Sequence, residues 1–158
     1  MANYITVLEA QDYADEQLNV DAWDEAKDED GSFWGEPGTK CYKALTMATR
    51  AINRLNYAGD KTDEDQVNAF PRGDDTEVPE DIKRACFECA LSFLDGIDLA
   101  IETENQTLVS QGYSNIRSTF DRSSPSPYIL AGIPSAQAWL LLLPYLRDNR
   151  TVTILRTN

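Results

Sequence analysis

The sequence contains no histidine, few cysteines and no long apolar segment. Its 158 residues include three cysteines, and fourteen basic side chains stand against twenty-seven acidic ones. Without histidine, the chain cannot form a Ser-His-Asp or Cys-His catalytic arrangement, or a zinc site that uses imidazole. No apolar run reaches about 18 residues, so we expect no membrane-spanning helix. The first fifteen residues lack the basic start and apolar core of an export signal, so we expect reduced thiols in a cytoplasm.

The net charge of −13 is concentrated near the N-terminus. Residues 1–39 hold eleven acids and one base, Lys27, whereas residues 101–158 hold four acids and five bases. A protein that holds nucleic acid neutralises phosphates with clustered Lys and Arg. The charge balance therefore argues against a surface that neutralises phosphates, although not against a surface that faces DNA without binding it.

Two amphipathic segments predict a mainly α fold in a single domain. After Pro79, which suits the first turn of a helix, apolar residues recur at helical spacing from Ile82 to Ile97. A second apolar stripe runs from Cys41 to Leu55. We expect core helices at about residues 39–55 and 79–98. The core is predicted to include Leu45, Ile52, Ile82, Cys86, Cys89 and Phe93.

Shorter elements complete the predicted fold. Thr6 and Glu9 have the spacing of a capping box, which predicts a short helix there, and another short helix is expected around residues 21–26. The segment after Pro134 has leucines all round, so we expect burial on more than one side. The fold class is a small helical bundle with a long irregular arm and an extended, strand-like C-terminal tail. The predicted parts are a helical domain (1–107), an extended arm (108–133), a short apolar helix (134–147) and a C-terminal docking tail (148–158).

Motifs for catalysis or metal binding are weak. Cys86 and Cys89 have C-x-x-C spacing, but a redox pair needs its first cysteine at a helix N-terminus, and these two lie mid-helix on the apolar stripe. Three cysteines are too few for a closed structural zinc site. The acidic cluster before Gly31 fails the spacing of a calcium loop, because Ala26 would be its first ligand. We therefore expect no cofactor, no metal site and no enzymatic activity; the enzyme alternative is a carboxylate-based metal hydrolase.

Several segments together resemble the head–tail connector adaptors of tailed bacteriophages, which are head-completion proteins. The likeness covers most of the chain, and its most specific part begins at Phe70-Pro71-Arg72 and continues through Val78-Pro79 to Ile82-Lys83-Arg84-Ala85. The other segments are Ala44-Leu45, Ala48-Thr49-Arg50-Ala51-Ile52, Gly59-Asp60, Ala90-Leu91, Ala138-Trp139, Leu142-Leu143-Pro144-Tyr145-Leu146 and the strand-like tail that ends in Leu155-Arg156.

This resemblance implies a structural virion protein that forms a ring of about twelve copies, extending the DNA channel between portal and tail. Its implied partners are copies of itself, the portal protein, and a tail, stopper or nozzle protein, while DNA passes through without sequence-specific binding and no membrane is involved. The implied location is the virion neck, after assembly in the host cytoplasm. By position, the portal-docking tail comprises Thr151, Val152, Thr153, Ile154, Leu155 and Arg156, and the subunit or tail interface comprises Tyr113, Ile116, Phe120, Tyr128 and Trp139.

Similar chains are also identified as DnaT-like single-stranded-DNA-binding proteins of phage replication, which is the alternative interpretation. That function needs aromatic side chains stacked in a basic groove. Trp34, Tyr42 and Tyr57 supply aromatic rings, but the surrounding charge is unfavourable. Binding to DNA at low salt distinguishes the two interpretations.

Overall fold

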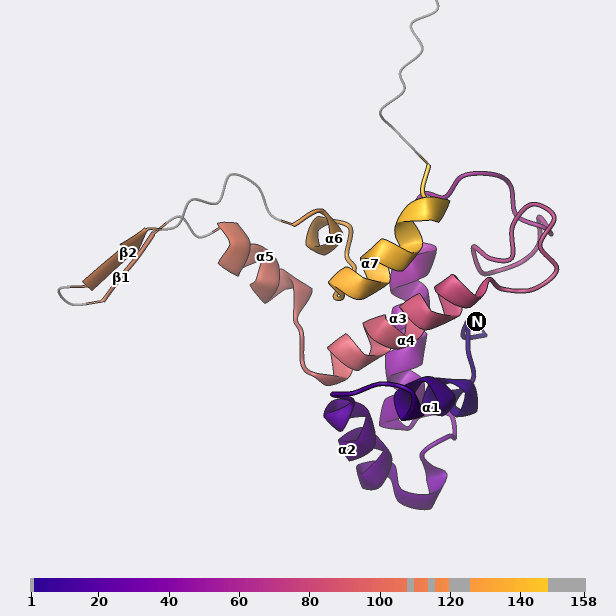
Figure 1. The fold of residues 1–158 in the computed structure, drawn as a ribbon, viewed down its shortest axis with the longest axis horizontal. Helices are drawn as coiled ribbons and strands as arrows, with labels where there is room; N and C mark the ends of the chain where they lie inside the picture. The colour runs from indigo at the N-terminus through magenta and orange to yellow at the C-terminus, as the bar shows by residue number, and fades with distance from the viewer. Residues whose placement is uncertain (1, 108–109, 114–115, 120–125, 148–158) are drawn as a thin grey trace, which may run out of the picture.

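A computed structural model describes residues 2–107, 110–113, 116–119 and 126–147 (Figure 1). This part of the chain is mainly α-helical, which confirms the predicted fold class. None of its helices is both long and apolar enough to cross a membrane. The strand-like tail expected at residues 151–156 lies outside the described residues, as does the rest of the predicted docking tail.

Helices α3 (Lys40–Asn53) and α4 (Glu80–Leu94) cross at the centre of the molecule (Figure 1). Both helices are shorter than the predicted 39–55 and 79–98. Helix α3 lies between its cap residues, Thr39 and Arg54, and the chain leaves the helical conformation after α4 at Gly96, which has a positive φ. Their facing sides bury apolar groups, and burial of this kind contributes about 25 cal/mol per Å² of apolar surface. Of the predicted core residues, Leu45, Ile52, Ile82, Cys86 and Cys89 are fully buried, whereas Phe93 is only half-buried.

Two short helices, α1 (Val7–Asp15) and α2 (Asp21–Asp30), cover one end of this pair, followed by a 3-10 turn, η1 (Gly31–Phe33). Helix α1 begins with the predicted capping box: the Glu9 N–H donates to Thr6 Oγ1 at 3.1 Å, and the Thr6 N–H donates to Glu9 Oε2 at 2.8 Å. Helix α2 extends four residues beyond the predicted segment. It buries Trp23, whose ring centre lies 5.4 Å from that of Phe87 on α4.

The long connection between α3 and α4 is held by aromatic packing around Phe70. The Phe70 ring packs edge-on against Tyr57, Tyr4 and Tyr145, with ring centres 4.6, 6.2 and 5.5 Å away. Such pairs contribute about 0.5–1.5 kcal/mol beyond the area they bury. Two residues later, the Arg72 guanidinium donates to backbone carbonyls of the same loop, including those of Ala58 and Ala69. The Phe70-Pro71-Arg72 segment therefore has a structural role.

The predicted arm contains more regular structure than expected. After α5 (Leu99–Thr107), strands β1 (Ser110–Tyr113) and β2 (Ile116–Thr119) form an antiparallel hairpin, which Figure 1 shows at the end of the molecule away from α1–α4. Alternation in this short, polar stretch is too weak to predict strands from sequence. A four-residue helix, α6 (Pro127–Leu130), follows and leads back to the body.

The apolar helix, α7 (Ala136–Leu142), packs on α4 and continues into a 3-10 turn, η2 (Leu143–Tyr145). Ala138 and Leu142 are buried, but Leu140 is 61% exposed and Leu143 44% exposed. The expectation that this helix is buried on more than one side is therefore wrong, because within the described chain its buried residues lie on the face toward α4.

Candidate nucleic-acid interface

An exposed cationic stripe runs along the side of α3 that faces away from the core. We define this α3 stripe as Lys43, Met47, Arg50 and Arg54, which follow one another at spacings of four, three and four residues. That spacing places all four side chains on one helical face. At 1.5 Å per residue the stripe is about 16 Å long. The same chain therefore has a locally positive surface despite its net charge of −13.

The three cations of the α3 stripe form no ion pair within the described part of the chain. Many of the other described cations already have partners. The Lys83 ammonium lies 3.3 Å from Glu9, Lys40 pairs with Glu29, and Arg84 lies near Glu80. At physiological ionic strength, charges more than about 8 Å apart are largely screened. An anion close to α3 therefore interacts more strongly with these unpaired cations than with the distant carboxylates.

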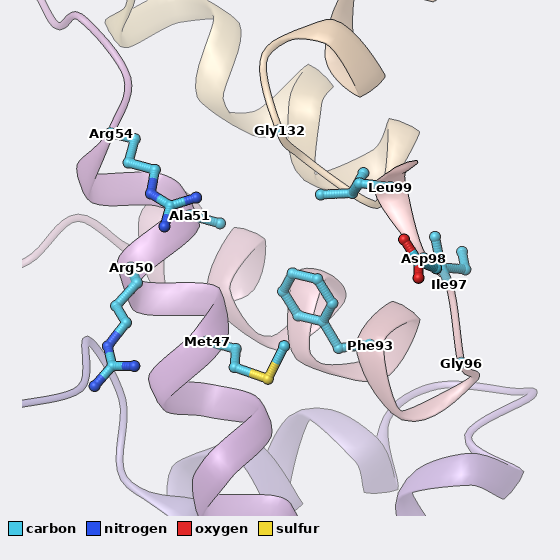
Figure 2. A pocket seen from close by; sticks show the side chains of 10 residues that line it. All are labelled: Met47, Arg50, Ala51, Arg54, Phe93, Gly96, Ile97, Asp98, Leu99 and Gly132. Carbon is cyan, nitrogen blue, oxygen red and sulfur yellow. The ribbon is translucent and has the colours of Figure 1, made fainter. Parts of the chain in front are cut away.

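Beside the α3 stripe lies a pocket of about 590 Å³, within the usual range for ligand pockets (Figure 2). Figure 2 shows Phe93 projecting from α4, and Leu99 from the start of α5, toward α3. Met47 is 49% exposed and lines the α3 side. The complete lining is Met47, Arg50, Ala51, Arg54, Phe93, Gly96, Ile97, Asp98, Leu99 and Gly132.

Two glycine turns shape the wall of this pocket. After α4, the Gly96 N–H donates to the Phe93 carbonyl and the Ile97 N–H donates to the Ser92 carbonyl, which is a Schellman motif. After α6, Gly132 and Ile133 repeat the same pattern with the carbonyls of Ile129 and Tyr128. Both glycines have positive φ, +83° and +81°, which other residues adopt only with strain. The turns end α4 and α6 at the edge of the pocket, and both glycines line it.

The aromatic residues expected from sequence are not the ones that line this pocket. Tyr57 is 3% exposed, and its hydroxyl donates to the Ile52 carbonyl at 2.9 Å. Trp34 has the Lys27 ammonium 4.9 Å from its ring centre. Tyr42 is half-buried against the core. Phe93 was assigned to the core from its place on the apolar stripe of α4, yet it is the aromatic ring beside the unpaired cations.

The three cysteines are buried and unpaired. Burial raises the pKa of Cys41 to about 11 and that of Cys86 to about 12, and it also raises the pKa of Cys89. A thiol reacts as its thiolate, so all three are unreactive at neutral pH. Within the described residues, no group of three or more acidic or cysteine side chains could hold a metal ion.

The structure describes four of the five residues expected at a subunit or tail interface. Tyr113 ends β1 opposite Ile116 at the start of β2, whereas Phe120 lies outside the described residues. Tyr128 on α6 and Trp139 on α7 are half-buried against the core. The expected portal-docking residues, Thr151 to Arg156, also lie outside the described residues.

Comparison with known families shows the family of the chain. Residues 2–153 match the family described as "Putative DnaT-like ssDNA binding protein". This match spans nearly the whole chain, and the protein belongs to that family. No curated protein and no solved structure gives a significant match.

The interpretation as a head–tail connector adaptor is therefore wrong. The family match overturns the portal-to-tail ring, the portal and tail partners, the unbound passage of DNA and the location in the virion neck. The alternative resemblance, to DnaT-like proteins, agrees with the match. The segment that carried the connector resemblance most specifically is explained by packing, because Phe70 lies at the centre of an aromatic cluster.

Proposed function

We propose that this protein binds single-stranded DNA through the α3 stripe and the adjoining pocket, in a role connected with replication. Membership of the DnaT-like family supports this proposal. The observation that carries it is the row of three unpaired cations, two of which, Arg50 and Arg54, line the same pocket as the half-buried Phe93 ring. The buried thiols, with burial raising the pKa of Cys86, support binding rather than thiol-based catalysis.

In this proposal, phosphates lie along Lys43, Arg50 and Arg54 while a base turns toward Phe93. Proteins that bind single strands combine a positive groove for the backbone with aromatic rings for the bases, and each stacked base contributes about 1–3 kcal/mol. Because Phe93 is recessed between α3 and α5, only a base that has left its stack reaches it. Paired bases in a duplex do not, which favours the single strand.

Salt dependence of binding tests the proposal quantitatively. Each phosphate neutralised on a single strand contributes about −0.7 to the slope of log K against log salt concentration, so three contacts predict a slope of about −2. We expect the Arg50→Ala, Arg54→Ala double variant to bind more than about tenfold more weakly and to show a slope smaller by about one to one and a half. Fluorescence anisotropy with a labelled mixed-sequence oligonucleotide measures both quantities.

The matched control is Lys61→Ala, which removes a cation from the loop before α4. The Lys61 ammonium donates to the Gln66 carbonyl and lies outside the α3 stripe. This variant should keep wild-type affinity and slope. Failure of the wild-type protein to bind at low salt overturns the proposed function, and an unchanged slope in the double variant overturns the proposed site.

A further inference from the structure

The pocket beside the α3 stripe contains one acidic side chain, Asp98, among apolar and cationic ones. Asp98 precedes α5, and its Oδ1 accepts the Ala100 N–H at 2.9 Å. This contact fixes the orientation of the carboxylate. Within the described residues Oδ2 has no hydrogen-bond partner, and Figure 2 shows the carboxylate on the α5 side of the pocket, with Leu99 and Phe93 also lining the space. The pocket thus offers an oriented hydrogen-bond acceptor next to an aromatic ring.

We propose that Asp98 makes this pocket selective for a base with an exocyclic amino group over thymine or uracil. A carboxylate accepts from the N4 amino group of cytosine, and adenine and guanine also carry amino donors. Thymine and uracil present a carbonyl oxygen where cytosine has its amino group. Their N3 proton is a donor, but it lies between two carbonyl oxygens, so a carboxylate that reaches it also faces an acceptor. The proposal rests on the proposed function, because it assigns base selectivity to the same pocket.

The cations of the site cannot supply this selectivity by contacting phosphates. Phosphate contacts fix the position of a strand but carry no sequence information, whereas contacts to base edges do. Phe93 is likewise tolerant, since every base has a face that stacks. Asp98 is the one acceptor side chain that lines the pocket. Discrimination between an amino and a carbonyl group therefore depends on it.

Oligo(dC) and oligo(dU) provide the probe, because they share a pyrimidine ring and differ in the 4-amino or 4-carbonyl group and the accompanying N3 proton. We expect the wild-type protein to bind oligo(dC) about fivefold more tightly, which is the lower end for a good base contact. In Asp98→Asn, the amide oxygen can still accept from Ala100, which leaves the amide nitrogen to donate into the pocket. We expect this variant to lose the preference or reverse it.

The matched control is Asp95→Asn, which removes the same charge three residues earlier, at a position that does not line the pocket. It should raise the affinity for both oligonucleotides equally and keep their ratio. Thermal unfolding checks that each variant is folded. Equal wild-type affinity for the two oligonucleotides, or an unchanged ratio in Asp98→Asn, overturns this inference while leaving DNA binding intact. Absence of binding to either oligonucleotide overturns the proposed function as well.

Discussion

Thr49 Oγ1 on α3 lies 3.6 Å from Cys86 Sγ on α4, at the crossing of the two helices. The same hydroxyl accepts the N–H of Tyr4 at 3.2 Å. Thr49 is 0% exposed, so water cannot replace either contact. One buried hydroxyl therefore joins the N-terminal segment to the helix pair that carries the α3 stripe and the pocket.

Replacing Thr49 by valine should lower the free energy of unfolding by about 1–3 kcal/mol. Valine keeps the shape of threonine but leaves the buried Tyr4 N–H without its acceptor. Urea denaturation measures the loss, and amide hydrogen exchange at Tyr4 should become faster. Thr49→Ser is the control: it removes a methyl group but keeps the hydroxyl, so Tyr4 should stay protected. Equal exchange at Tyr4 in both variants would contradict this explanation.

Gly96→Ala should destabilise the protein by about 1–2 kcal/mol, because Gly96 has φ +83° and an L side chain is strained there. The added Cβ meets no atom within 4 Å, so the cost comes from the backbone rather than from a clash. Gly35→Ala is the matched control, since Gly35 has no positive φ and also has open space around its Cα. It should be neutral or slightly stabilising. Urea denaturation of the two variants under the same conditions makes the comparison.

The contribution of Glu9 to stability should depend on pH. Hydrogen bonds from Thr6, followed by the nearby Lys83 ammonium, lower the pKa of the Glu9 carboxyl below its usual 4.5. Because the folded pKa is the lower one, the stabilisation is complete above the unfolded pKa and is lost as pH falls through the folded pKa. Glu9→Gln should therefore be slightly less stable than wild type at pH 7 and equally stable in strong acid. A stability difference that persists unchanged at the acid end would contradict this assignment.

Phe93→Ala should weaken single-stranded DNA binding by about 1–3 kcal/mol, or roughly 5- to 150-fold, because it removes the stacking ring. The salt slope should not change, since the cations remain. Phe93→Leu separates stacking from apolar contact, because it keeps an apolar side chain in the pocket without an aromatic face. Anisotropy titrations over a range of salt concentrations give both values. A changed slope would show that Phe93 positions the cations instead of stacking.

Local signals in the sequence predicted the helical elements well. The capping box at Thr6 and Glu9 and the apolar stripes through Leu45 and Cys86 depend on contacts within a few residues or on helical periodicity. The boundary of α4 was extended too far, because Ile97 continues the periodicity after Gly96 has ended the helix. The one-sided burial of α7 could not be read from sequence, since it depends on which neighbours reach the helix.

The candidate site was missed for a related reason. Overall charge argued against DNA binding, yet the spacing of Lys43, Arg50 and Arg54 on one helical face was present in the sequence. What the sequence did not show is that Phe93 and Asp98, around the end of α4, meet Gly132, far along the chain, beside that face. Their proximity in space depends on tertiary packing and on the turns at Gly96 and Gly132. Local charge patterns therefore deserve more weight than net charge in a protein of this composition.

The separation of charge between α3 and α2 has a consequence for where a bound strand lies. Helix α2 carries six carboxylates and one ammonium group, whereas the charged side chains of the α3 stripe are all cations. On the proposed function, the carboxylates of α2 repel the phosphates that the cations of α3 attract. A bound strand is therefore directed to the α3 side of the molecule and away from the end that α2 covers.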